Sequence, residues 1–136
     1  MSNVKEVPVF LFTGFLESGK TKFIQETLED KRFNSGERTL LVVCEEGEEE
    51  YAPDKFSAPN VFMVTVEEPE ELTRDAFRKW LDRYDCERCV IEYNGMWMLD
   101  DLYQALPELW MVYQEFFFAD ARSILSYNAN MRSLVY

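Results

Sequence analysis

Apolar and polar residues follow one another along this chain in blocks, and the blocks predict strands and helices in alternation. Continuous apolar runs bounded by glycine or polar residues predict buried strands at residues 7–13, 39–44, 61–66, 89–93 and, with a break in polarity, 111–118. Apolar residues at helical spacing predict helices at residues 20 to about 31, 70–84 and 98–106. The tail, residues 123–136, is expected to be helical as well.

Strands that alternate with helices indicate an α/β fold, because parallel strands need crossover helices that then cover the faces of the sheet. With 136 residues, of which 47% are hydrophobic, the chain has the size of a single domain with one core. No internal repeat, flexible linker or low-complexity segment divides the sequence. We therefore expect one α/β domain over residues 1–136, built on a mainly parallel sheet.

The net charge and the apolar segments of the chain bear on whether it binds nucleic acid or a membrane. It carries 26 acidic and 14 basic residues and no histidine, which gives a net charge of −12. A nucleic-acid surface needs clustered Lys and Arg, so this class of partner is not expected. The sequence also shows no signal peptide and no apolar stretch near the roughly 18 residues of a membrane span. We expect a cytoplasmic protein without a membrane partner.

Three cysteines, Cys44, Cys86 and Cys89, do not predict a disulfide framework, because their number is odd and the expected compartment is reducing. Cys86 and Cys89 form a C-x-x-C motif, which is typical of a redox pair or of half a metal site. No second pair and no histidine complete four ligands, so burial at the fourth strand is the favoured interpretation. Binding of a transition metal (Zn, Co or Ni) through the three thiols is the alternative.

The segment between the first predicted strand and the first predicted helix carries the clearest chemical signal. Residues 14–21, GFLESGKT, match the P-loop pattern G-x-x-x-x-G-K-[ST] in the structural context that this motif requires. Its glycines let backbone N–H groups point inward at a helix N-terminus and bind an anion. Lys20 is expected at the β- and γ-phosphates, and Thr21 at Mg²⁺. The expected nucleotide-binding residues are Gly14, Glu17, Ser18, Gly19, Lys20, Thr21 and Lys22.

Acidic residues follow two of the predicted strands. Glu92 ends the apolar run CVIE, where a Walker B acid belongs, and Glu45 follows the strand that ends at Cys44. Ligands bind at the carboxyl ends of parallel strands, so Gly14, Glu45 and Glu92 should converge there. The candidate metal ligands are Thr21, Glu45 and Glu92, and the candidate catalytic residues are Lys20 and Glu92. Five of the six residues 45–50 are Glu. We expect this segment to be a solvated acidic loop; the alternative is that one of its acids faces a bound Mg²⁺.

The motifs together resemble the CobW-type GTPases, P-loop proteins that are related to the UreG and HypB nickel-insertion GTPases and include metal chaperones. TGFLESGKT at residues 13–21 is similar to the family's TGFLGSGKT. CEEG at 44–47 and EYNG at 92–95 resemble its Asn-Glu-x-Gly and Glu-x-x-Gly elements. FFFADA at 116–121 resembles a later family strand that ends in Asp-Ala. The resemblance runs over essentially the whole chain.

The resemblance implies a P-loop NTPase fold, a three-layer α/β/α sandwich, with GTP or GDP and Mg²⁺ as ligands. It implies GTP binding, Mg²⁺-dependent hydrolysis and a link to metal-cofactor handling. The family's guanine-reading Asn-Lys-x-Asp motif, its Cys-x-Cys-Cys metal motif and its C-terminal domain have no counterpart here, which predicts a truncated, partial GTPase domain. The choice of GTP over ATP therefore follows from the resemblance alone. Glu17 replaces a small residue of the loop, and its carboxylate either points outward or weakens nucleotide binding.

Two alternatives remain open from the sequence. In one, the chain is a non-catalytic nucleotide-binding or interaction module, a truncated fragment or half of a split GTPase. Its last predicted strand, 111–118, would then be an unpaired sheet edge open to a second copy or to the missing C-terminal half. In the other, a degenerate P-loop protein binds phosphate or nothing. The sequence identifies neither the oligomeric state nor a metalloprotein client.

Overall fold

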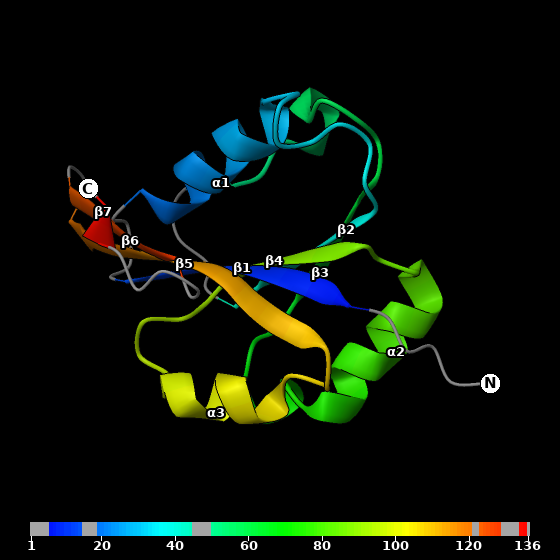
Figure 1. Ribbon diagram of the computed structural model, residues 1–136, viewed down its shortest axis with the longest axis vertical. Helices are drawn as coiled ribbons and strands as arrows, with labels where there is room; N and C mark the ends of the chain where they lie inside the picture. The colour runs from blue at the N-terminus through cyan, green and yellow to red at the C-terminus, as the bar shows by residue number, and fades with distance from the viewer. Residues whose placement is uncertain (1–5, 15–18, 45–49, 121–122, 129–133, 136) are drawn as a thin grey trace.

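A twisted sheet forms the middle of the molecule (Figure 1). The computed structural model describes residues 6–14, 19–44, 50–120, 123–128 and 134–135, with side chains up to residue 118. In this part of the chain the sheet has seven strands, in the order β3-β2-β4-β1-β5-β6-β7. The strands are β1 Val7–Gly14, β2 Thr39–Val43, β3 Val61–Thr65, β4 Arg88–Glu92, β5 Trp110–Asp120, β6 Ser123–Asn128 and β7 Leu134–Val135. Strands β1 to β5 are parallel to one another, whereas β6 and β7 pair in the antiparallel sense.

Helices cover both faces of the sheet (Figure 1). Helix α1 (Lys20–Glu29) lies on one face, and α2 (Arg74–Tyr84) and α3 (Leu99–Ala105) lie on the other. Two short 3-10 helices, η1 (Pro53–Lys55) and η2 (Pro69–Glu71), interrupt the connections. The predicted α/β fold with a mainly parallel sheet is thus confirmed for the described residues.

The two covered faces explain why the central strands β2 and β4 are apolar over most of their length. In β2, Leu40 and Val42 pack into the core on the side of α2 and α3, while Leu41 and Val43 pack on the side of α1. All five residues of β2 are buried. A strand buried on both faces reads as a continuous apolar run rather than as an alternation, which is the pattern that predicted these strands.

The predicted strands are confirmed, with ends that differ by one or two residues. The helix predicted at residues 70–84 begins only at Arg74, because Thr73 is its N-cap and accepts a hydrogen bond from the N–H of Ala76 at 3.1 Å. Residues Pro69–Glu71 form the separate helix η2. Helix α1 ends at Glu29, two residues early, because Asp30 adopts an extended conformation.

The prediction of a helical tail is wrong for the described residues, which form β6 and β7. The predicted unpaired edge at residues 111–118 is also wrong, because β6 pairs with β5 from Gln114 to Asp120. Both errors have one cause: the eleven-residue strand β5 offers a row of backbone N–H and C=O groups, which the following segment satisfies. Serine and asparagine in that segment give a helix little intrinsic preference to compete with this pairing.

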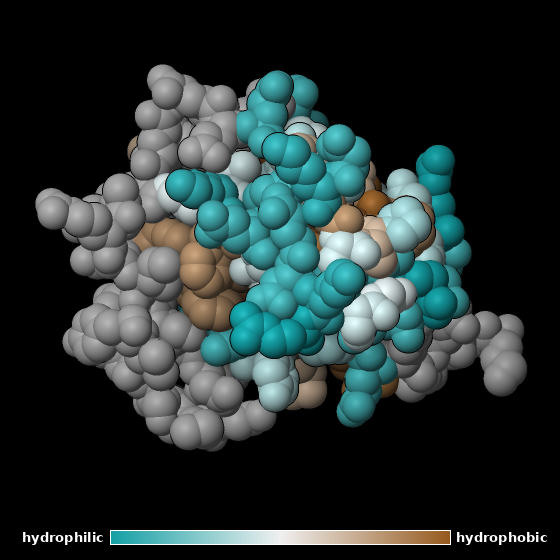
Figure 2. All heavy atoms as spheres, turned by 90° about the horizontal axis from the view of Figure 1, so that it is seen from above, coloured by the Kyte–Doolittle hydropathy of each residue, from teal (hydrophilic) through white to brown (hydrophobic). Residues whose placement is uncertain are grey.

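The face that carries α1 is largely hydrophilic, in keeping with the net charge of −12 (Figure 2). A hydrophobic area shows on the side of the molecule where Figure 1 places β6 and β7. Among the described residues, no helix combines the length and the apolar character needed to cross a membrane.

Candidate functional site

The carboxyl ends of β1, β2 and β4 meet at one edge of the sheet. Glu92 at the end of β4 is paired in register with Phe12 on β1 and with Val43 on β2. Beyond these pairs, the N–H of Tyr93 donates to Phe12 O at 2.8 Å and the N–H of Cys44 donates to Glu92 O at 2.9 Å. The strand ends that were expected to share one site therefore lie side by side.

Gly14 ends β1 in a conformation that no other residue fits. Its φ is 130°, and a Cβ atom at this position would lie 2.3 Å from the carbonyl oxygen of Phe118 on β5. The chain therefore leaves β1 at close range to the backbone of β5, and glycine is required on both counts.

Gly19 is the N-cap of α1, with a left-handed φ of 97°. Glycine has no side chain that could accept hydrogen bonds from the first amides of the helix. The first turn contains no acidic residue and opens with Lys20, Thr21 and Lys22, so neither a cap nor a carboxylate competes for these N–H groups within the turn. The positive end of the helix dipole favours an anion at such a place.

Lys20 is buried, with 2% of its surface exposed. Its ammonium donates a hydrogen bond to Gly14 O at 2.7 Å, which joins the two ends of the loop over residues 15–18. A buried cation beside an amide-rich helix terminus adds to the preference of this place for negative charge.

Thr21 and Glu92 are 71 positions apart in the sequence, yet the Thr21 hydroxyl donates to Glu92 Oε2 at 2.7 Å. Glu92 is only 3% exposed. Thr21 and Glu92, two of the three predicted metal ligands, thus lie in contact. The contact brings a hydroxyl and a carboxylate together at the residue that follows Lys20 in α1.

Tyr51, which sequence reasoning missed, also contacts Glu92. Its hydroxyl donates to Glu92 Oε1 at 2.7 Å. Burial, followed by the charge of Glu92, raises the pKa of Tyr51 far above its ordinary value of 10.0. The raised pKa agrees with a protonated phenol as the donor of this hydrogen bond.

Gln25 fixes the backbone next to Tyr51. Its side-chain amide accepts from the N–H of Ala52 at 2.9 Å and donates to Ala52 O at 3.1 Å. Gln25 lies four residues after Thr21 and hence on the same face of α1, a spacing that could have marked it in the sequence. No comparable signal marks Tyr51, because its position depends on the path of the preceding loop.

The remaining predicted residues divide into two groups. Lys22 is described and is exposed on the first turn of α1. Glu17, Ser18 and Glu45 lie outside the described residues, so their predicted roles stay predictions.

All three cysteines are buried in the core on the side of α2 and α3. Burial raises the pKa of Cys89, and the neighbouring Cys86 and Cys44 raise it further. Within the described residues, no group of three or more His, Cys, Asp or Glu side chains is placed to hold a metal ion. The burial of Cys86 and Cys89 agrees with their interpretation as core residues.

No model of a known protein family matches the sequence, and no curated protein matches it either.

Proposed function

We propose that this chain binds a nucleoside triphosphate, GTP in the first place, together with Mg²⁺ at the carboxyl end of its sheet, and hydrolyses it. The fold proposed with this function is the three-layer α/β/α sandwich of a P-loop NTPase. The observation that carries the proposal is the 2.7 Å hydrogen bond from Thr21 to Glu92, because it joins the last residue of a P-loop motif to the residue at the Walker B position.

The phosphate chain would occupy the first turn of α1. The first amides of α1, which the Gly19 side chain does not cap, and the buried Lys20 favour a multiply charged anion. Lys20 now donates to a neutral carbonyl, Gly14 O. A phosphate oxygen is a charged acceptor, and hydrogen bonds to charged groups are roughly twice as strong as neutral ones. A phosphate oxygen within reach of this ammonium would therefore be a stronger acceptor than the carbonyl.

Mg²⁺ fits the oxygen groups that lie beside Lys20. It prefers hard oxygen ligands and takes few of them from the protein in nucleotide sites, where phosphates and water supply the rest. Thr21 Oγ1 would be a direct ligand, and the carboxylate of Glu92 would hold that hydroxyl or a coordinated water in place. Bound there, the ion would neutralise charge on the β- and γ-phosphates.

The residues of the chain act on hydrolysis mainly by position and charge. Phosphoryl transfer needs little covalent help from the protein, so a site gains rate by binding the charge that spreads over the γ-phosphate oxygens. Lys20 is the described cation at this place, and its burial strengthens its interaction with phosphate. Glu92 orients the Thr21 hydroxyl.

Guanine as the base, and a role in metal-cofactor handling, rest on the resemblance to CobW-type GTPases. Of the motifs that carry this resemblance, TGFLESGKT ends at Thr21 in α1 and EYNG begins at Glu92, the last residue of β4. Titration with ADP as a control therefore tests whether the site prefers guanine to adenine.

Calorimetric titration with GDP and a non-hydrolysable GTP analogue, with and without Mg²⁺, tests the binding site. We expect Lys20→Ala to weaken binding by roughly 50-fold or more, because it removes a charged donor to phosphate. Lys31→Ala is the matched control: it removes the same charge from an exposed position beyond the other end of α1 and should bind like the wild type. Equal affinity of the two variants, or no binding by the wild type, would contradict the proposal.

Turnover is measured separately, as phosphate release from GTP in the presence of Mg²⁺. We expect release by the wild type and none above background by Lys20→Ala. Binding without release would remove hydrolysis from the proposal and leave a nucleotide-binding module.

A further inference from the structure

Glu92 receives hydrogen bonds at both of its carboxylate oxygens. Thr21 donates to Oε2 and Tyr51 donates to Oε1, each at 2.7 Å. Only Thr21 belongs to the P-loop motif. Tyr51 comes from the segment that precedes η1, and the proposed nucleotide site does not by itself require it.

The chain holds Tyr51 in place by a second pair of hydrogen bonds. Gln25 binds both the N–H and the carbonyl of Ala52, in the manner of a neighbouring strand. Because Gln25 and Thr21 are four residues apart on α1, one face of that helix supports both donors of Glu92. The helix presents Thr21 directly and fixes Tyr51 through the backbone of the next residue.

We propose that Tyr51 is a positioning residue of the Mg²⁺-nucleotide site, which orients the Glu92 carboxylate toward Thr21 and is itself held by Gln25 and Ala52. This inference rests on the proposed function and deepens it. It assigns Tyr51 no contact with the nucleotide.

The physical basis is the soft terminal torsion of glutamate. Rotation of a carboxylate about its last side-chain bond has broad minima, so a hydrogen bond at Oε2 alone restricts the group less than bonds at both oxygens. The donor at Oε1 adds to the restriction. The Thr21 hydroxyl has one hydrogen and two lone pairs, so the direction of its bond to Glu92 decides where the lone pairs point. Tyr51 thereby sets the direction in which Thr21 can offer its oxygen to a metal ion.

The effect of Tyr51 should consequently appear only where Mg²⁺ takes part. The amides of α1 and the ammonium of Lys20 bind phosphate without help from Glu92, so affinity in EDTA does not depend on the carboxylate. Affinity in Mg²⁺ contains the contribution that Thr21 and Glu92 make together.

The test is calorimetric titration of Tyr51→Phe with a non-hydrolysable GTP analogue, in Mg²⁺ and in EDTA. The substitution removes one hydroxyl and leaves the ring. We expect affinity in Mg²⁺ to fall about five- to tenfold, the size of one hydrogen bond to a charged group, and affinity in EDTA to be unchanged. Gln25→Ala, which releases Ala52, should weaken binding in the same direction and again only in Mg²⁺.

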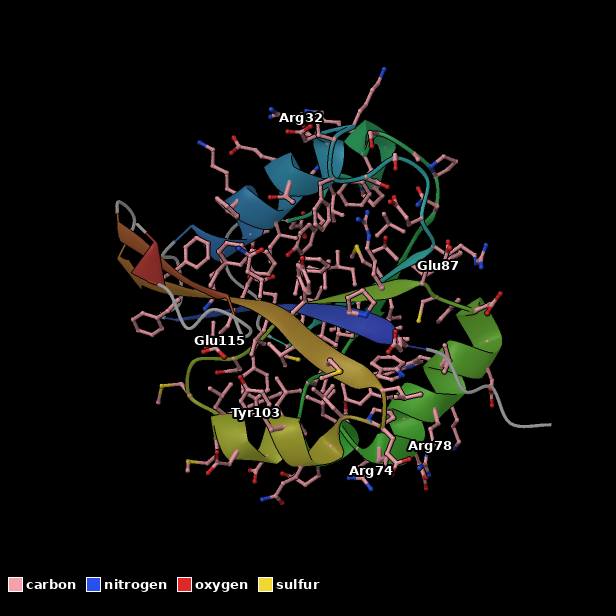
Figure 3. The ribbon with its side chains drawn as sticks, in the orientation of Figure 1. Arg32, Arg74, Arg78, Glu87, Tyr103 and Glu115 are labelled. Atoms are coloured by element: carbon pink, nitrogen blue, oxygen red, sulfur yellow. The ribbon has the colours of Figure 1, made fainter. Side chains whose placement is uncertain are left out.

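Tyr103→Phe is the matched control. Tyr103 on α3 also donates its hydroxyl to a glutamate, Glu115 on β5, but this pair is exposed and lies on the face opposite α1 (Figure 3). The control should bind like the wild type in both conditions.

Three results would overturn the inference. Wild-type affinity of Tyr51→Phe in Mg²⁺ would show that the hydroxyl positions nothing, and an equal loss in Mg²⁺ and EDTA would reveal a merely structural role. In both cases the proposed function stands, because the wild type binds with Mg²⁺ dependence. Absence of nucleotide binding by the wild type itself would overturn the two proposals together.

Discussion

Strand β4 begins and ends with a buried charged residue, and the two ends use their charges differently. Arg88 opens the strand with 7% of its surface exposed, and Glu92 closes it with 3% exposed. Both ends form polar clusters with residues from distant parts of the sequence. The nature of the partners distinguishes a cluster that completes the fold from one that is suited to a ligand.

At the amino end, the guanidinium of Arg88 is directed at fixed acceptors of the chain. It donates to Thr39 Oγ1 at 2.7 Å and to Phe33 O at 2.5 Å, and its carbon lies 4.0 Å from the centre of the Phe33 ring. Asn34 and Glu37 complete the surroundings at 3.4 and 3.7 Å. Burial lowers the pKa of Arg88, which the charges of Glu37 and Glu87 partly offset.

At the carboxyl end, the described partners include carbonyl and hydroxyl groups, which a ligand would share under the proposed function. The ammonium of Lys20 rests on a neutral carbonyl, and the carboxylate of Glu92 accepts from two hydroxyls whose oxygens keep lone pairs. Under the proposed function, phosphate and Mg²⁺ would share these polar groups. The comparison teaches that a buried charge indicates a ligand site when its partners are exchangeable, and a structural role when they are not.

Gly14→Ala should have the largest effect on stability, because it acts on the backbone at the carboxyl end. We expect the free energy of unfolding to fall by about 4 kcal/mol, from a strained φ together with the overlap with Phe118 O. Gly36→Ala is the control, since Gly36 has a φ of 118° but nothing within 4 Å of the added Cβ. It should cost about 1 kcal/mol. Urea denaturation measures both, and equal losses would show that the approach to β5 does not matter.

Arg88→Met tests the structural role of the amino end. The substitution keeps the stem and removes the donors, which leaves the partly buried Phe33 O and the buried Thr39 Oγ1 without this partner, so we expect a loss of about 3 kcal/mol. Nucleotide affinity should not change. Arg32→Met is the control, because Arg32 is an exposed residue that pairs with Asp30 (Figure 3). It should unfold at the same urea concentration as the wild type, and a similar loss in both variants would count against the buried cluster.

A pair of asparagines compares the two ends directly. Asn34, 1% exposed, donates to Leu28 O at 3.1 Å and accepts from Asn60 at 3.2 Å. Asn34→Ala should therefore cost about 2 kcal/mol. Asn94 at the carboxyl end is half-buried and donates to Cys44 O at 3.3 Å, so Asn94→Ala should cost about 1 kcal/mol. Denaturation curves that reverse this order would contradict the account of the amino end.

The smallest effect comes from the middle of β4, where Cys89 follows Arg88. Its pKa in the folded state is raised above the ordinary value of 9.0. The unfolded chain therefore loses this proton first, and folding stability that is present below about pH 9 is lost as the pH rises. Between pH 9 and pH 10, we expect the free energy of unfolding of Cys89→Ala to fall by about 1 kcal/mol less than that of the wild type. Identical pH profiles of the two proteins would show that the thiol does not contribute.

Local patterns predicted much of this molecule from its sequence. The strands were visible because both faces of the sheet are covered and every residue of β2 is apolar or buried. The meeting of Thr21 and Glu92 followed from two rules: a P-loop lies between a strand and a helix, and parallel strands bring their carboxyl ends together.

Contacts set by distant parts of the chain escaped prediction. The pairing of β6 with β5 depends on backbone groups far from the local sequence, and it overrode the expected helix. Arg88 was left outside the fourth strand because a charged residue breaks an apolar run, although its partners Phe33 and Thr39 bury it. Tyr51 reaches Glu92 through a loop whose path no local pattern specifies.

The central claim is that the Glu92 end of β4 serves a ligand and the Arg88 end serves the fold. Thermal unfolding of the wild type, Arg88→Met and Glu92→Gln, each with and without a non-hydrolysable GTP analogue and Mg²⁺, tests it most directly, because ligands that bind only the folded state raise Tm. We predict that Arg88→Met starts from a lower Tm and shows the full ligand-induced rise. Glu92→Gln should start near the wild type and lose the part of the rise that depends on Mg²⁺. An equal rise in Glu92→Gln and the wild type, or no rise in the wild type, would contradict the claim.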